Sequence, residues 1–181
     1  MADEITIGDL LKIEYEQLKQ EQRNRIGVRD NLIYATLGSM AVVIAAALQA
    51  KGPANLLLML PPVTIVLGWT YLVNDEKVSA IGRYIRTELA PRLAVLTGDG
   101  EQVFGWEAAH RTGARRLSRK ALQLTVDLGT FGVPALAAIV VFWVNGPLTP
   151  AFLIVSIVEA VAVGLLAWQI VLHADLSANA S

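Results

Sequence analysis

The stretch of sequence from Leu128 to Val158 reads LGTFGVPALAAIVVFWVNGPLTPAFLIVSIV, and it contains no charged side chain. The apolar character continues past Glu159 to Ala174. A helix needs about 20 largely apolar residues to cross the hydrocarbon of a bilayer, so this stretch has room for two crossings. Residues 145–150, Asn-Gly-Pro-Leu-Thr-Pro, divide it, because proline cannot extend a helix and glycine supplies unusual dihedral angles. We therefore predict a transmembrane helical hairpin.

Two shorter uncharged runs, 31–50 and 52–74, lie on either side of Lys51. Each fits one crossing, with a turn at Lys51-Gly52-Pro53. The chain has 181 residues, 54% of them apolar, and its mean hydropathy is +0.49. A soluble protein of this size cannot surround four helices that are apolar on every face. The predicted fold is all-α, a four-helix transmembrane bundle of two helical hairpins, with spans near 31–50, 54–73, 122–144 and 150–173.

The basic residues predict the orientation of these spans. Fourteen of the fifteen lysines and arginines fall in residues 1–30 and 74–120, and Lys51 is the fifteenth. Loops rich in lysine and arginine stay on the cytoplasmic side. We expect both termini in the cytoplasm and the protein in the plasma (bacterial inner) membrane. The expected parts are a cytoplasmic N-terminal helix, a first transmembrane hairpin, a cytoplasmic central segment, a second transmembrane hairpin and a short cytoplasmic tail, at 1–30, 31–73, 74–120, 121–173 and 174–181.

Helices are also expected outside the spans. Residues 9–26 predict a helix with Asp9 as its N-cap. The second span is expected to continue into the cytoplasm until Pro91 ends it. This extension carries an apolar stripe, which needs the N-terminal helix, a second subunit or the membrane surface as its partner. The stripe consists of Val78, Ile81, Ile85 and Leu89.

The end of the central segment combines aromatic and basic residues just before the third span. Arginines beside aromatic rings can hold phosphates and stack on bases. The same composition beside a bilayer binds anionic lipid headgroups, at about 1 kcal/mol per cation. We expect anionic lipid here, with a cytoplasmic protein or a nucleotide-type ligand at 74–120 as the alternatives. The candidate residues are Trp106, Arg111, Arg115, Arg116, Arg119 and Lys120.

Glu159 is the acidic residue deepest in the predicted bundle. It lies nine residues beyond Pro150, so at ~1.5 Å per residue it is ~13 Å below the outer surface, near the bilayer middle. Charged groups at this depth are costly and usually face the bundle interior or water. Glu159 is either a pore-lining or proton-sensitive carboxylate, or a protonated acid that hydrogen-bonds to a neighbouring helix.

Asp127 and Gln169 fall at a similar depth on the third and fourth spans. We predict an interhelical contact between them. The alternative is that Asp127 reaches toward Arg119 or Lys120.

Prolines and small residues interrupt or narrow the spans. Kinks are expected at Pro61, Pro62 and Pro134, because proline removes a backbone hydrogen bond. Small residues let helices approach closely. They lie four apart on the fourth span and on the first, as Ser156, Ala160 and Gly164 and as Ala41 and Ala45.

Catalytic and metal-binding motifs are not found. The chain contains no cysteine, no phosphate-binding loop and no His-Glu-x-x-His helix. We expect neither enzymatic activity nor a cofactor.

The order of helices resembles the SLATT-type membrane effectors of bacterial nucleotide-signalled defence systems. The resemblance depends on residues 22–31, which lead into the first span, and on Val73-Asn74-Asp75-Glu76-Lys77, which lead out of the second. It covers about residues 9–96, contains no diagnostic motif and does not extend to the second hairpin. It implies homo-oligomers that perturb the membrane when a signal arrives. The function expected first is therefore an oligomeric channel or membrane-permeabilising effector, followed by a membrane anchor or scaffold that recruits a cytoplasmic partner, and then by a small dimeric transporter.

Overall fold

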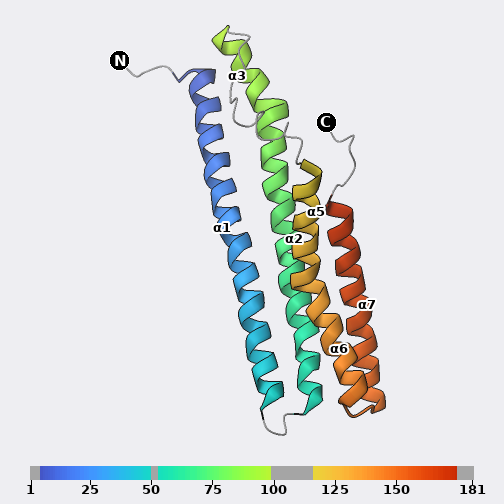
Figure 1. The fold of residues 1–181 in the computed structure, drawn as a ribbon. Helices are drawn as coiled ribbons and strands as arrows, with labels where there is room; N and C mark the ends of the chain where they lie inside the picture. Colours follow the sequence, from blue (N-terminus) through green and yellow to red (C-terminus); the bar gives the residue numbers. More distant parts are fainter. Residues whose placement is uncertain (1–4, 50–52, 99–115, 175–181) are drawn as a thin grey trace. The chain divides into compact units, whose positions relative to one another are not determined.

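The computed structural model describes residues 5–49, 53–98 and 116–174, and these residues form helices joined by short turns, with no strand among them (Figure 1). Four helical stretches are long and apolar enough to cross a membrane: Ile7–Leu48, Ala54–Leu96, Lys120–Asn145 and Pro150–His173. This confirms the all-α prediction and the four apolar helices of a multi-pass membrane protein. The elements are α1 (Ile7–Leu48), η1 (Ala54–Met59), α2 (Leu60–Tyr84), η2 (Ile85–Leu89), α3 (Ala90–Thr97), α5 (Arg116–Asp127), η3 (Leu128–Gly132), α6 (Val133–Asn145) and α7 (Pro150–His173).

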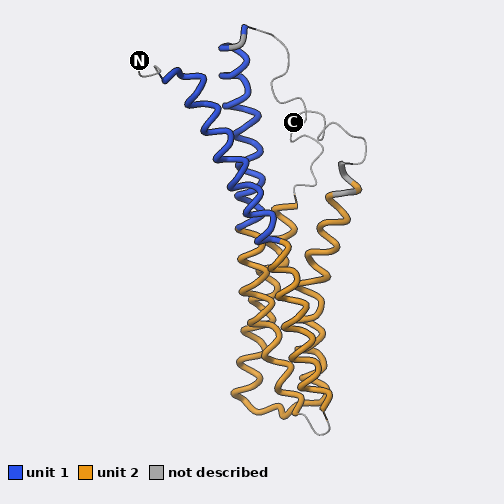
Figure 2. Tube along the Cα trace, turned by 90° about the vertical axis from the view of Figure 1, so that its left-hand side faces the viewer, with its two compact units in different colours: residues 1–29, 74–116 blue, residues 30–73, 117–181 orange. Residues whose placement is uncertain are grey.

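The chain divides into two compact units (Figure 2). The first unit is Met1–Arg29 with Asn74–Arg116, and the second is Asp30–Val73 with Leu117–Ser181. The first unit takes nearly all the basic residues and the second takes the uncharged runs.

In the first unit, the N-terminal part of α1 packs against the end of α2 and the helices that follow it. The buried core is Leu11, Ile85 and Leu89, and half-buried apolar residues surround it: Tyr15, Leu18, Ile81, Tyr84 and Leu93. The apolar stripe that continues from the second span therefore has the N-terminal helix as its partner. Burial of this stripe stabilises the pairing of the two helices, at about 25 cal/mol per Å² of apolar surface removed from water.

Polar side chains join the same two helices next to this core. We call the group Arg25, Arg29, Asn74 and Asp75 the clasp. Asn74 is 7% exposed, and its amide nitrogen donates to the Arg25 carbonyl at 2.7 Å. Arg25 Nη1 donates back to Asn74 Oδ1 at 3.4 Å, and Arg29 Nη1 pairs with Asp75 Oδ1 at 3.1 Å. An asparagine buried between helices specifies their register, because any slip leaves its amide unsatisfied.

A third polar contact lies further from the clasp. The Tyr84 hydroxyl donates to Glu14 Oε1 at 2.7 Å. The hydrogen bond to this carboxylate raises the pKa of Tyr84 above its ordinary value, because loss of the proton would place two negative charges side by side.

The start of α1 differs from the prediction. Asp9 is not the N-cap; the helix begins at Ile7, and the Thr6 hydroxyl accepts a hydrogen bond from the Asp9 amide at 3.2 Å. Asp9 Oδ2 accepts from the Thr6 hydroxyl at 2.6 Å and from its amide at 3.0 Å. This reciprocal pair is a capping box, in which Thr6 is the N-cap and Asp9 is the third residue of the helix. These bonds hold the pKa of the Asp9 carboxyl below its ordinary value.

Pro91 does not end the helix that continues from the second span, and that prediction was wrong. The five residues before α3 form the π-helical turn η2, in which the amide of Ala90 donates to the carbonyl of Ile85. The wider turn accommodates the proline ring, which would otherwise meet the carbonyl four residues earlier. The helix ends instead at Thr97, where Gly98 adopts φ 66°, a left-handed conformation that favours glycine.

Pro134 follows a second π-helical turn of the same form. The amide of Val133 donates to the carbonyl of Leu128 across η3, and Pro134 is the second residue of α6. Pro61 and Pro62 lie in the first turn of α2, directly after the 3₁₀-helix η1. Helix starts tolerate proline because their amides have no intrahelical acceptor. All three prolines therefore lie at changes of helix type.

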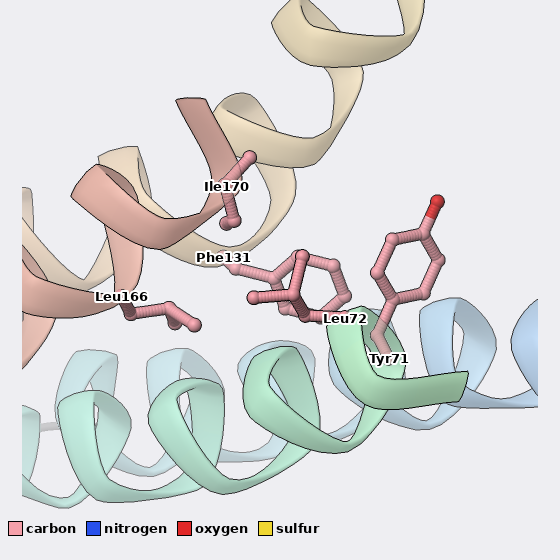
Figure 3. Close-up of a cluster of buried hydrophobic side chains, with 5 residues drawn as sticks. All are labelled: Tyr71, Leu72, Phe131, Leu166 and Ile170. Carbon is pink, nitrogen blue, oxygen red and sulfur yellow. The ribbon is translucent and has the colours of Figure 1, made fainter. Parts of the chain in front are cut away.

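The second unit contains two hairpins whose helices pack on one another. Figure 3 shows side chains from α2, η3 and α7 converging on one core. Its buried members are Tyr71, Leu72, Phe131, Leu166 and Ile170. Gly68 lies beside this core: a Cβ there would meet Leu166 Cδ2 at 2.8 Å and Phe131 Cγ at 3.0 Å. The bare backbone is what allows α2 to approach so closely.

The turn of the second hairpin uses glycine for space rather than for an unusual dihedral angle. Gly146 has φ −93°, which any residue can adopt, but a Cβ there would clash with the Phe142 ring. Thr149 is the N-cap of α7, and its hydroxyl accepts from the Phe152 amide at 3.5 Å. Of the first turn, Lys51 and Gly52 lie outside the described residues.

Candidate intramembrane polar site

One face of α7 is buried along the length of the helix. Its buried residues are spaced by three and four: Ser156, Glu159, Val163, Leu166 and Ile170. This is the spacing of a single helix face packed on its neighbours. The predicted small-residue face differs from it, since Gly164 is exposed and Ser156 is the only member of that set with a fully buried side chain. The packing face of α7 therefore includes Glu159.

Glu159 is 8% exposed, and its Oε2 is buried with no hydrogen-bond partner. Its location inside the bundle agrees with the expectation that an acid at this depth avoids lipid. Among the described residues, Oε2 makes no hydrogen bond to a neighbouring helix. The placement also puts the side chain among helices of its own chain rather than on an outer surface.

The polar group nearest along the helix is already satisfied. Ser156 lies one turn before Glu159, and its hydroxyl accepts from Trp143 Nε1 at 2.8 Å and donates to the Leu153 carbonyl at 3.0 Å. Ala160, the residue that follows Glu159 in the chain, packs against an apolar cluster of Leu58, Ile139 and Phe142. The residues next to Glu159 on α7 are therefore either packed on apolar side chains or already hydrogen-bonded to other partners.

The sequence did not indicate the Trp143–Ser156 pair. The indole N–H donates across the two helices of the second hairpin, from α6 to α7. Buried tryptophan usually finds such a partner, but which hydroxyl it reaches depends on the helix rotation.

Asp127 and Gln169 occupy different surroundings. Asp127, the last residue of α5, is 8% exposed, and Gln169 on α7 is half-buried. No described hydrogen bond joins the two side chains, so their contact stays a prediction, as does the approach of Asp127 to Arg119 or Lys120.

Most of the predicted basic site lies beyond the described residues. Trp106, Arg111 and Arg115 fall outside them, and for Arg116 and Arg119 the structure gives the backbone of α5 but not the side chain. Lys120 is half-buried on α5. Binding of lipid headgroups or a nucleotide by this segment stays a prediction.

Within residues 5–49, 53–98 and 116–174, no group of three or more acidic or histidine side chains could hold a metal ion. Comparisons with protein-family models, with curated proteins and with solved structures gave no match to this chain.

Proposed function

We propose that this multi-pass membrane protein forms homo-oligomers that act as a channel or membrane-permeabilising effector. The supporting observation is the exposure of its first crossing. Only 6% of the residues in the most apolar part of α1 are fully buried, against 39% for the second crossing. A helix with so few buried residues leaves apolar surface available to a second copy.

The exposed face of α1 has the character of a helix–helix contact. Small residues lie on it at spacings of three and four, between two larger exposed residues, and the full set is Tyr34, Gly38, Ala41, Ala45 and Leu48. No atom lies within 4 Å of a Cβ placed on Gly38. Small residues at this spacing allow two backbones to approach closely in lipid.

The proposed orientation places both termini and the first unit in the cytoplasm of a bacterial cell. Its support is the distribution of lysine and arginine, fourteen of which fall in residues 1–30 and 74–120, outside the uncharged runs. Because Glu159 packs within its own chain, the proposal places the contact between copies on α1 rather than on α7.

The proposal is tested with the full chain in lipid nanodiscs and in liposomes. Native mass spectrometry of the nanodiscs gives the number of copies, and dye release from the liposomes gives the flux. Ala41→Leu is expected to lower both, because the larger side chain prevents close approach. Gly164→Leu is the control, since Gly164 is also exposed, on α7, and no atom lies within 4 Å of a Cβ placed there. A wild-type monomer, or equal effects of the two substitutions, would refute the proposal.

A second candidate, a membrane anchor that recruits a cytoplasmic partner, is favoured by apolar residues exposed on the first unit. Ile7, Leu10 and Ile13 are 68%, 56% and 53% exposed on α1. Crosslinking in cells tests this candidate. Leu10→Glu should abolish a crosslinked product while leaving the oligomer intact, because Leu10 lies outside the buried core. A crosslinking pattern that the substitution does not change would reject recruitment through this surface.

A further inference from the structure

The carboxyl of Glu159 differs from the other acids of the described chain. Glu14 accepts a hydrogen bond from Tyr84, and Asp75 pairs with Arg29. Asp127 is as buried as Glu159 but has an interaction partner. Glu159 alone combines a side chain more than nine-tenths buried with an oxygen that has no partner.

The elements packed around Glu159 bring no countercharge to it. Neither η1, η3 nor α6 contains a titratable residue. The part of α2 in the second unit contains only Tyr71, which packs on Phe131 with ring centroids 5.1 Å apart. That core meets α7 at Leu166 and Ile170, ~10 Å or more along the helix from Glu159.

The remaining titratable groups among the described residues of the second unit lie toward the helix ends. Asp30 and exposed Tyr34 are near the start of its part of α1, and His173 ends α7. Arg119, Lys120 and Asp127 are on α5. Of these titratable residues, His173 is on the same helix as Glu159, and the three on α5 are on the segment continuous with α6. At ~1.5 Å per residue, none of the four reaches the level of Glu159. Among the side chains that the structure describes, an ionised carboxylate at this position would have no cation to compensate it.

We propose that Glu159 is an intramembrane proton-binding site: the packed bundle holds this carboxyl in its protonated form, and release of the proton loosens the packing of α7. The physical reason is the cost of an unpaired charge in an apolar interior, which a neutral carboxylic acid avoids. The neutral acid can also donate its O–H to a backbone carbonyl, as the Thr64 hydroxyl does to Pro61. The inference depends on neither oligomerisation nor flux.

The first test is chemical labelling of the full chain in liposomes with dicyclohexylcarbodiimide, which partitions into the hydrocarbon. The carboxylic acid adds across one C=N bond, so that its oxygen bonds to carbon and its proton moves to nitrogen. In the absence of water, the acyl group then migrates to nitrogen, and one intact carbodiimide stays on the residue. Peptide mass spectrometry is expected to find the adduct on Glu159, and a water-soluble carbodiimide should leave it unlabelled.

The labelling is followed from about pH 4, near the ordinary pKa of a glutamate, to about pH 10, and should fall by about tenfold per pH unit once the proton is released. An unlabelled Glu159 in the folded protein, or equal labelling by the water-soluble reagent, would overturn the proposal. This test uses the wild-type chain and therefore does not depend on whether a variant folds.

The second test is thermal unfolding across the same pH range. The wild-type midpoint should fall with rising pH, because stability is present while the acid is neutral and is lost as the proton leaves. Glu159→Gln keeps a neutral group of the same shape and should remove this part of the pH dependence. Glu16→Gln, at an exposed acid of the first unit, should leave it unchanged. Identical pH profiles for wild type and Glu159→Gln would overturn the proposal.

Discussion

Substitution of Gly68 tests whether close helix approach holds the second unit together. In Gly68→Ala, the new Cβ would lie 2.8 Å from Leu166 Cδ2 and 3.0–3.1 Å from two Phe131 carbons. The leucine methyl is the end of a flexible side chain, but Leu166 is 2% exposed and Phe131 is fully buried, so neither has free space. Overpacking of this kind costs about 1–3 kcal/mol.

Alanine also favours a helix over glycine by about 0.8–1.0 kcal/mol, which opposes the steric cost. Gly164→Ala separates the two effects. Gly164 lies in a helix as Gly68 does, but no atom lies within 4 Å of its Cβ position. The difference in unfolding free energy between the two variants is therefore the overpacking alone, about 1–3 kcal/mol, with Gly68→Ala the less stable.

The assay is reversible unfolding in mixed micelles, followed by circular dichroism. Leu166→Val in the Gly68→Ala background should recover part of the loss, because the shorter side chain vacates the space, and the two substitutions should then be non-additive. Equal stabilities for Gly68→Ala and Gly164→Ala, within about 0.5 kcal/mol, would show that α2 does not approach this core as closely as described.

Three further predictions concern the first unit. Asn74→Leu should destabilise the pairing of its helices by about 1–3 kcal/mol, because both hydrogen bonds of its amide group to Arg25 are lost, and faster hydrogen exchange confined to this unit would show it. Leu89→Ala removes a fully buried side chain and should cost about 2–5 kcal/mol, seen as proteolysis of the unit in otherwise intact protein. Tyr84 should ionise at higher pH than a free tyrosine, so its hydrogen bond to Glu14 contributes below pH 10 and is lost as pH rises through the raised pKa. The tyrosinate absorbance difference between wild type and Tyr84→Phe measures this, and ionisation at the ordinary value would contradict it.

The apolar helices were predictable because their signal is long and redundant. The fourth span was expected at 150–173 and is found at Pro150–His173, since Thr149 and Pro150 define its start and the apolar run defines its length. The same reasoning failed at single residues. Thr6 rather than Asp9 caps α1. Threonine and aspartate are both favoured at the N-cap, and the sequence does not say which of the two occupies that position.

The behaviour of Pro91 could not be predicted from local sequence. A proline inside a helical pattern usually ends the helix, but here a π-helical turn over Ile85–Leu89 accommodates it. Such a turn costs hydrogen-bond geometry and persists when packing offsets that cost. Ile85 and Leu89 are both fully buried against α1, a contact between residues distant in sequence.

The candidate site shows the same limit. That Glu159 faces the interior follows from the cost of charge in lipid, and the structure agrees. That its Oε2 lacks a partner depends on which helix faces meet, and the sequence alone does not give this. The buried face of α7 follows a spacing of three and four, whereas the small residues were expected to pack at a constant spacing of four.

Each of the two units is stabilised internally by different interactions. In the first, apolar burial at Leu11 is reinforced by hydrogen bonds and an ion pair, such as Arg29 with Asp75. In lipid the hydrophobic effect no longer favours one apolar contact over another, so the helices of the second unit depend on packing density and on a few satisfied polar groups. A buried carboxyl oxygen without a partner adds nothing to either. Its presence on the packed face is the strongest reason to examine Glu159 for a role other than stability.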